Sequence, residues 1–99
     1  MPHEVVLAPR ALNDLFAIYV YVAEAAGTAV ADAYDARLRQ ACLGLASFPR
    51  RGAPRDDLGK GVRTLSFERR AVIAYRVEGA TVRILRVLHR GRELGLAFE

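Results

Sequence analysis

The chain has 99 residues, which is enough for one domain with a modest core. Apolar residues make up 53% of it, which excludes a disordered chain, and no apolar run reaches the roughly 18 residues that a membrane span needs. We therefore expect a single globular domain over residues 1–99.

Cysteine use and the first residues point to the cytoplasm. The only cysteine, Cys42, excludes an internal disulfide and any metal site built from several cysteines. The segment Met1-Pro2-His3-Glu4 has neither the basic start nor the apolar stretch of a signal peptide. We therefore expect a protein of the reducing cytosol.

The net charge of +4 is unevenly distributed. Residues 1–48 carry three arginines against five acidic residues, a net charge of −2. Residues 49–99 carry eleven arginines and one lysine against six acidic residues, a net charge of +6. The preference for arginine over lysine is equally consistent with a high-GC genome, but codon use does not explain the asymmetry. A basic second half predicts an acidic partner surface or a nucleic acid as the binding partner.

The first half reads as a short strand followed by two helices. Glu4 to Leu7 is typical of a strand, and Pro9 suits the first turn of a helix. Gly27 is expected to end that helix, and Thr28 to cap the next one. The expected apolar stripe of the first helix is Leu12, Leu15, Phe16, Tyr19 and Val22, with Asn13, Asp14, Ala17 and Glu24 largely on the other side. The expected stripe of the second helix is Val30, Ala33, Tyr34, Leu38, Ala41 and Leu45. The short break predicts an antiparallel helical hairpin.

The second half reads as a loop and three strands. Phe48-Pro49 ends the helices, and Arg50 to Gly61 has the glycine, proline and charge of a loop. Hairpin turns then separate three strands, which span Val62 to Phe67, Ala71 to Val77 and Thr81 to His89. The last strand is apolar on both faces and is therefore expected inside the sheet. The predicted fold class is α+β, in the order β-α-α-β-β-β, with an antiparallel sheet packed by the N-terminal hairpin.

The usual signatures of catalysis and metal binding are weak. Asp56-Asp57 lies beside Arg55 and is interpreted as a solvated turn, because no second acidic cluster opposes it. Cys42 sits among alanine and leucine and is interpreted as a small buried hydrophobe. His3 and His89, the only histidines, lie on different elements, so we expect no metal and no cofactor.

The arginines of the strands leave two interpretations open. Arg63 and Arg86 interrupt apolar rows, so they either pair within the fold, for example with Glu68 or Asp57, or form a cationic surface for phosphates or an acidic protein. His89 ends the last strand, where it is either structural or a general acid or base beside arginines.

A set of short segments follows one another in a characteristic order along nearly the whole chain. The segments are Asp14-Leu15, Ile18, Tyr21-Val22, Leu45, Phe48-Pro49, Gly52, Arg55-Asp56-Asp57-Leu58, Gly61-Val62-Arg63, Val72-Ile73-Ala74-Tyr75-Arg76-Val77 and Ile84-Leu85-Arg86-Val87-Leu88-His89-Arg90-Gly91-Arg92. Taken together in this order, they resemble the ParE-type toxins of the RelE/ParE superfamily.

The resemblance implies the toxin of a type II toxin–antitoxin, or plasmid stabilisation, system. It implies a ParD-like antitoxin that wraps the toxin between helical hairpin and sheet as a hetero-oligomer, for instance a heterotetramer, and it implies DNA gyrase as the target. Operator DNA is then reached only through the antitoxin, and no small-molecule ligand is expected. The expected antitoxin contacts are Leu12, Leu15, Phe16, Tyr19 and Leu38. The expected target contacts are Arg69, Arg70, Arg76, Arg90 and Arg92.

The alternative is a RelE-like, ribosome-dependent mRNA endonuclease that needs no metal. Members of that type use Arg, Lys, His, Glu or Tyr on the sheet face. This chain departs from that pattern, because Lys60 is its only lysine and no tyrosine follows His89. The alternative site would be Arg63, Arg86 and His89. We expect a binding toxin and not an enzyme.

Overall fold

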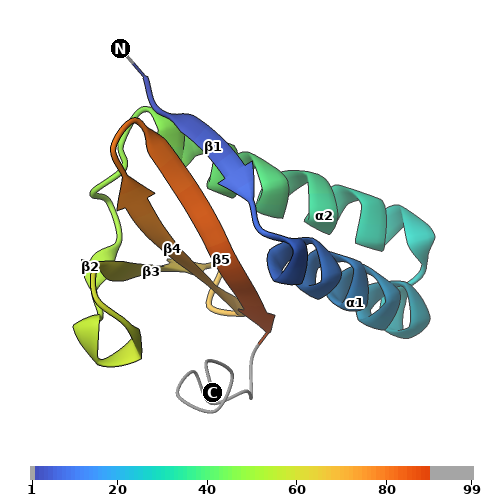
Figure 1. Ribbon diagram of the computed structural model, residues 1–99. Helices are drawn as coiled ribbons and strands as arrows, with labels where there is room; N and C mark the ends of the chain where they lie inside the picture. The colour runs from blue at the N-terminus through green and yellow to red at the C-terminus, as the bar shows by residue number, and fades with distance from the viewer. Residues whose placement is uncertain (1, 90–99) are drawn as a thin grey trace.

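The computed structural model describes residues 2–89. Two helices lie together on one face of a five-stranded sheet (Figure 1). The helices are α1 (Pro9–Ala26) and α2 (Thr28–Leu43), followed by a 3-10 turn, η1 (Gly44–Ala46), and later by η2 (Asp56–Leu58). The strands are β1 (Glu4–Leu7), β2 (Ala53–Pro54), β3 (Val62–Phe67), β4 (Ala71–Glu78) and β5 (Thr81–His89). The predicted α+β class and the helical hairpin are confirmed.

The sheet has the order β1-β5-β4-β3-β2, so β5 lies inside it as predicted. The expectation of an antiparallel sheet is correct for the three pairs that link β2 to β5, and wrong for β1, which runs parallel to β5. The reason is topological: the hairpins between β3, β4 and β5 force antiparallel neighbours, whereas both helices and three further strands separate β1 from β5 in the chain. The predicted loop also contains β2 and η2.

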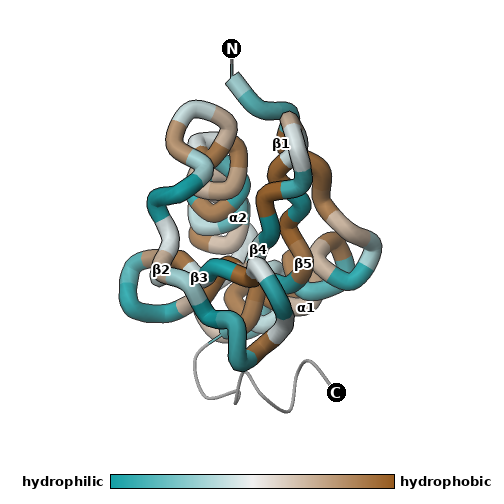
Figure 2. Tube along the Cα trace, turned by 60° about the vertical axis from the view of Figure 1, so that its left-hand side comes forward, coloured by the Kyte–Doolittle hydropathy of each residue, from teal (hydrophilic) through white to brown (hydrophobic). Residues whose placement is uncertain are grey.

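The core lies between the helices and the sheet. Figure 2 shows β5 as largely hydrophobic, while the loop around β2 is largely hydrophilic. Helix α2 buries Ala31, Tyr34, Leu38 and Cys42, and the sheet buries Ile73, Tyr75, Val82, Ile84 and Val87. Burial raises the pKa of the Cys42 thiol to about 11, which fits a small buried hydrophobe.

The expected apolar stripe of α1 is partly wrong. The side chains that α1 buries are Ala11, Leu15 and Ile18, whereas Leu12 is 45% exposed and Phe16 is 69% exposed. The helix carries apolar residues around most of its circumference, so periodicity alone did not identify the side facing the sheet. In α2, Val30 is likewise exposed, against expectation.

Glycines shape two critical positions. Gly27 ends α1 with φ 94°, and its N–H donates to the Ala23 carbonyl at 2.8 Å, as expected. Gly27 is also the N-cap of α2, and the expected cap by the Thr28 side chain is absent. Gly52 brings its loop against Tyr75, whose hydroxyl accepts the Gly52 N–H at 2.7 Å. A β-carbon at Gly52 would lie 2.7 Å from that hydroxyl.

Candidate partner-binding surface

The most prominent exposed feature is an apolar ridge on α1, formed by Leu12, Phe16 and Val20. These side chains are spaced four residues apart and are 45%, 69% and 37% exposed. Residues at that spacing follow one side of a helix, so the three form a continuous apolar strip, which we call the α1 ridge. Exposed apolar strips on small proteins commonly mark contact sites for other macromolecules.

The five expected antitoxin contacts divide between surface and core. Leu12 and Phe16 lie on the α1 ridge, whereas Leu15 and Leu38 are 1% and 0% exposed and pack beneath it. Tyr19 is half-buried, and its hydroxyl donates to Asp32 on α2 at 2.6 Å. This hydrogen bond raises the pKa of Tyr19 and ties the two helices together beside the ridge. The sequence did not single out Val20, because it lay outside the expected stripe.

A second feature is the turn between β3 and β4, which carries Glu68, Arg69 and Arg70. Glu68 and Arg69 have φ values of 49° and 59°, in the left-handed region. The Arg37 side chain of α2 holds Glu68 through two hydrogen bonds of 2.8 and 3.1 Å. These bonds lower the pKa of the Glu68 carboxyl. Arg69 and Arg70 are both exposed, so the turn presents two guanidinium groups at the surface.

The other expected target contacts lie elsewhere. Arg76 is on the far half of β4, where its Nε donates to the Lys60 carbonyl at 3.0 Å. Its Nη1 also lies 3.6 Å from Glu78. The structure therefore does not bring Arg76 together with Arg69 and Arg70. Arg90 and Arg92 lie outside the described residues.

Arg86 is buried and paired within the fold. Its Nε and Nη2 donate to the Asp14 carboxylate at 2.8 and 2.9 Å, and the Val87 N–H donates to the same carboxylate at 2.9 Å. The internal pairing that the sequence suggested is present, but the prediction of Glu68 or Asp57 as the partner is wrong, because the carboxylate belongs to Asp14. Asp14 was assigned to the polar side of α1, and 72 residues separate it from Arg86, so no local pattern linked them.

The suggested catalytic set, Arg63, Arg86 and His89, is not assembled. Arg63 lies opposite Tyr75 at the start of β3, and its Nη1 donates to the carbonyls of Arg50 and Gly52 at 3.3 and 2.7 Å. His89 lies opposite Ala71, the first residue of β4 and four positions from Tyr75 along that strand. Its ring stacks edge-on against Tyr21 and Tyr34, with centroid distances of 5.4 and 6.3 Å. Burial, and secondarily the charge of Arg70, lower the pKa of His89.

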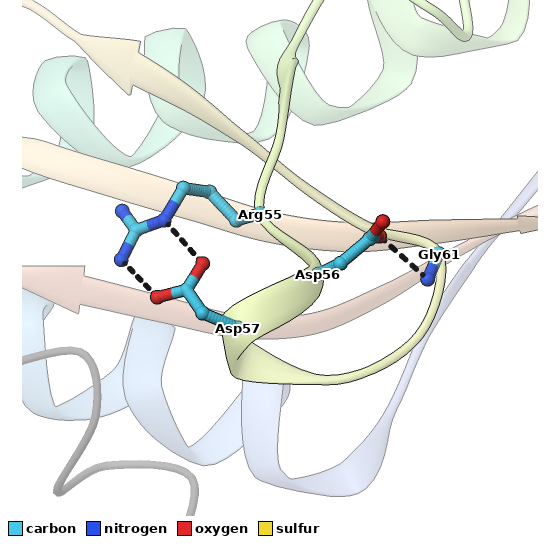
Figure 3. A network of polar contacts seen from close by, with 4 residues as sticks. All are labelled: Arg55, Asp56, Asp57 and Gly61. Carbon is cyan, nitrogen blue, oxygen red and sulfur yellow. Dashed lines mark hydrogen bonds and ion pairs between the residues drawn. The ribbon is translucent and has the colours of Figure 1, made fainter.

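The adjacent acidic residues Asp56 and Asp57 are exposed in the short turn η2, as the sequence indicated. Figure 3 shows Asp57 accepting two hydrogen bonds of 2.9 Å from Arg55, while Asp56 accepts the Gly61 N–H at 3.1 Å. The Arg55 contact lowers the pKa of the Asp57 carboxyl.

Within residues 2–89, no group of three or more histidine, cysteine, aspartate or glutamate side chains is arranged to hold a metal ion. In the same range, no helix is long and apolar enough to span a bilayer.

The sequence of this chain is similar to that of known toxins. The family model of the ParE toxin of the type II toxin–antitoxin system parDE matches residues 5–94. Toxin ParE3 of Caulobacter vibrioides is 40% identical over 76 residues, which are 77% of this chain and 75% of that protein.

Two solved structures share the fold. A chain of the chromosomal ParDE toxin–antitoxin system from P. aeruginosa superimposes with a TM-score of 0.78 and 28% identity, covering 88% of this chain and 95% of that one. A chain of the toxin–antitoxin complex RelBE2 from Mycobacterium tuberculosis gives a TM-score of 0.68 and 25% identity, covering 91% of this chain and all of that one, at 100%. With its fold, its order of motifs and its sequence all in agreement, this chain belongs to the ParE toxin family of type II toxin–antitoxin systems.

Proposed function

We propose that this toxin is neutralised in the cytoplasm by a ParD-like antitoxin that covers the α1 ridge. The observation that carries this proposal is the exposure of Leu12, Phe16 and Val20 along one side of α1. An amphipathic antitoxin helix would bury these side chains, and its acidic residues would complement the toxin, whose net charge is +4. Leu15 and Leu38 would contribute by holding the ridge in place, and Tyr19 by linking it to α2.

The antitoxin contact is tested with a matched pair of variants, one in each helix. Phe16→Asp places a carboxylate on the ridge, while Ala36→Asp places the same charge on an exposed position of α2. We expect Phe16→Asp to weaken antitoxin binding by about 2 kcal/mol or more in calorimetric titrations, because an apolar anchor is replaced by a charge. Ala36→Asp should bind like the unmodified chain. Equal affinities for both variants would place the antitoxin on another surface.

We further propose that the toxin acts by binding DNA gyrase and not by cutting RNA. Family membership supports this target, and so does the presentation of Arg69 and Arg70 on a turn that the Arg37–Glu68 contact holds. Arg63 lies opposite Tyr75 and His89 opposite Ala71, positions four residues apart on β4, and Arg86 is paired with Asp14. These positions argue against a reduced nuclease site of the three residues.

A gyrase supercoiling assay distinguishes the two activities. Inhibition with accumulation of cleaved DNA is expected, and the double variant Arg69→Glu, Arg70→Glu should fold normally but lose this inhibition. Unimpaired supercoiling, together with loss of cellular transcripts that His89→Ala abolishes, would instead establish the RelE-like endonuclease. A reading frame beside the toxin gene that begins with a ribbon-helix-helix segment and ends in an acidic amphipathic tail would support the antitoxin partner.

A further inference from the structure

A cleft of about 410 Å³ opens where the end of the helical hairpin meets the end of the sheet. Tyr21, Val30 and Tyr34 line it from the helices, and Arg70 and His89 line it from the sheet. We call it the Tyr34 cleft. Leu12, Phe16 and Val20 do not line it, so it is separate from the α1 ridge.

The charges around the Tyr34 cleft do not cancel. Arg37 and Glu68, which also line the cleft, neutralise each other through their two hydrogen bonds. Arg70 lies beside them, and within residues 2–89 it makes no ion pair. One guanidinium charge is therefore left at the cleft, and a guanidinium binds carboxylate or phosphate oxygens in preference to neutral groups.

The Tyr34 side chain adds a hydrogen-bond donor. Tyr34 is only 7% exposed, and its hydroxyl has no hydrogen-bond partner among the residues described. Burying a hydroxyl without a partner is unfavourable, and native structures have few such groups. The Tyr34 ring packs edge-on against Phe67 and His89, with centroid distances of 5.7 and 6.3 Å, so its orientation is fixed.

We propose that the Tyr34 cleft binds one oxyanion, a carboxylate or a phosphate group, through the charge of Arg70 and hydrogen bonds from Tyr34 and His89. These three groups can all donate to the same acceptor, which is the chemistry that an oxyanion requires. The Tyr34 hydroxyl is covered in this conformation, and the Arg37 guanidinium carbon lies 5.6 Å from the centre of its ring. Oxyanion binding therefore requires a side chain that covers this hydroxyl to move aside.

The test is an NMR titration of the purified, ¹⁵N-labelled chain with inorganic phosphate and, separately, with acetate. Sodium chloride at matched ionic strength is the control for general screening. We expect saturable shifts in the amide signals of Tyr34, Arg70 and His89. The probe that saturates at the lower concentration identifies phosphate or carboxylate as the preferred source of the oxyanion.

Neighbouring arginines provide a matched pair of variants. Arg69 and Arg70 are both exposed in the same turn, but only Arg70 lines the cleft. Arg70→Gln should weaken binding of the preferred anion by about tenfold, because a charged hydrogen bond to the anion is lost. Arg69→Gln removes no such bond and should weaken binding by less than about twofold. Shifts that sodium chloride reproduces, or equal weakening by the two variants, would overturn the proposal.

Tyr34→Phe separates binding from stability. Because the hydroxyl has no hydrogen-bond partner among the residues described, its removal should leave the melting temperature unchanged or raise it. The same substitution should weaken anion binding by about threefold to tenfold. A lowered melting temperature with unchanged anion affinity would show that the hydroxyl serves the fold, and would contradict its part in the site.

Discussion

Helix α1 presents apolar side chains on two sides, and the two sides have different environments. Ala11, Leu15 and Ile18 face the sheet and are at most 6% exposed. The residues next to them in sequence, Leu12 and Phe16, are exposed on the α1 ridge. Hydropathy does not distinguish the two sides, since both are composed of apolar residues. The comparison shows that an apolar residue in an amphipathic helix is not thereby a core residue.

The energetic difference between the two sides is large. Full burial of a leucine or phenylalanine side chain stabilises a protein by about 1.5–3 kcal/mol. On the sheet side, this free energy already stabilises the folded chain. On the ridge, it would be gained only when a partner covers the side chains. The same substitution should therefore change the free energy of unfolding much more on the sheet side than on the ridge.

The largest expected effect comes from a charge on the sheet side. Leu15→Asp puts a carboxylate at a position that is 1% exposed, among apolar residues of the core. We expect it to lower the free energy of unfolding by more than about 4 kcal/mol, as measured by urea denaturation followed by circular dichroism.

Phe16→Asp makes the comparison direct. Phe16 is the next residue and is 69% exposed, so the same charge there should change the free energy of unfolding by less than about 0.5 kcal/mol. Similar losses for Leu15→Asp and Phe16→Asp would show that the two sides of α1 do not differ as described.

Much of the fold was predictable because its signals are local. The glycine break at Gly27, the turns between the last three strands and the apolar character of β5 each lie within a few residues, and together they determine the hairpin and most of the sheet. The parallel pairing of β1 with β5 has no such signal. It joins Glu4–Leu7 to residues 81–84, which lie beyond both helices and three strands in the chain.

The candidate site was less predictable for the same reason. Leu12 and Phe16 were predicted to contact the antitoxin, and they are exposed, although the periodicity also placed them in the buried stripe. Asp14 was placed on the polar side of α1, yet it accepts three hydrogen bonds from β5. The Tyr34 cleft depends on side chains from α1, α2, β5 and a turn, and no spacing in the sequence indicates that these meet.

The second prediction concerns the ion pair between Asp14 on α1 and Arg86 on β5. The side chains of Arg86 and Asp14 are only 7% and 14% exposed. Asp14→Ala leaves the Arg86 charge buried without its carboxylate and should lower the free energy of unfolding by about 3–5 kcal/mol. Chemical denaturation measures this loss, and Arg86→Met in the same chain should restore part of it.

Asp57→Ala is the matched control for that ion pair. It also removes a carboxylate from a two-point arginine contact, but that contact is exposed, and little change in stability is expected. If Asp14→Ala were as mild as Asp57→Ala, the Asp14–Arg86 pair would not anchor α1 to the sheet.

The third prediction concerns Tyr75, a core residue on the sheet side. Gly52→Ala would place a β-carbon 2.7 Å from the Tyr75 hydroxyl and 2.8 Å from the Thr64 carbonyl oxygen. We expect a loss of about 1–3 kcal/mol in the free energy of unfolding, because the loop must move away. At Gly44 an added β-carbon would meet no other part of the chain within 4 Å, and φ is −62°. Gly44→Ala should therefore stabilise the protein by about 0.4–1 kcal/mol. Equal effects would mean that this loop is not closely packed.

The smallest effect is expected at His89, where α1 and α2 meet the end of β5. Its ring contacts Tyr21, which is 61% exposed, and Tyr34, which is 7% exposed. Burial lowers the pKa of His89 below the ordinary value of 6.5, so the unfolded chain binds a proton more readily than the folded one. The stability that His89 contributes is therefore fully present above pH 6.5 and is lost as the pH falls through its folded-state pKa.

Urea midpoints measured from about pH 7.5 down to about pH 5.5 test this dependence, because histidine is the side chain that ordinarily titrates in that range. The unmodified chain should lose stability more steeply than His89→Gln, which has no group to protonate at this position. His3 remains in both proteins, so its contribution cancels in the difference. Parallel curves for the two proteins would show that the imidazole is as accessible to protons in the fold as in the unfolded chain, and that this end of α1 is not closed against β5.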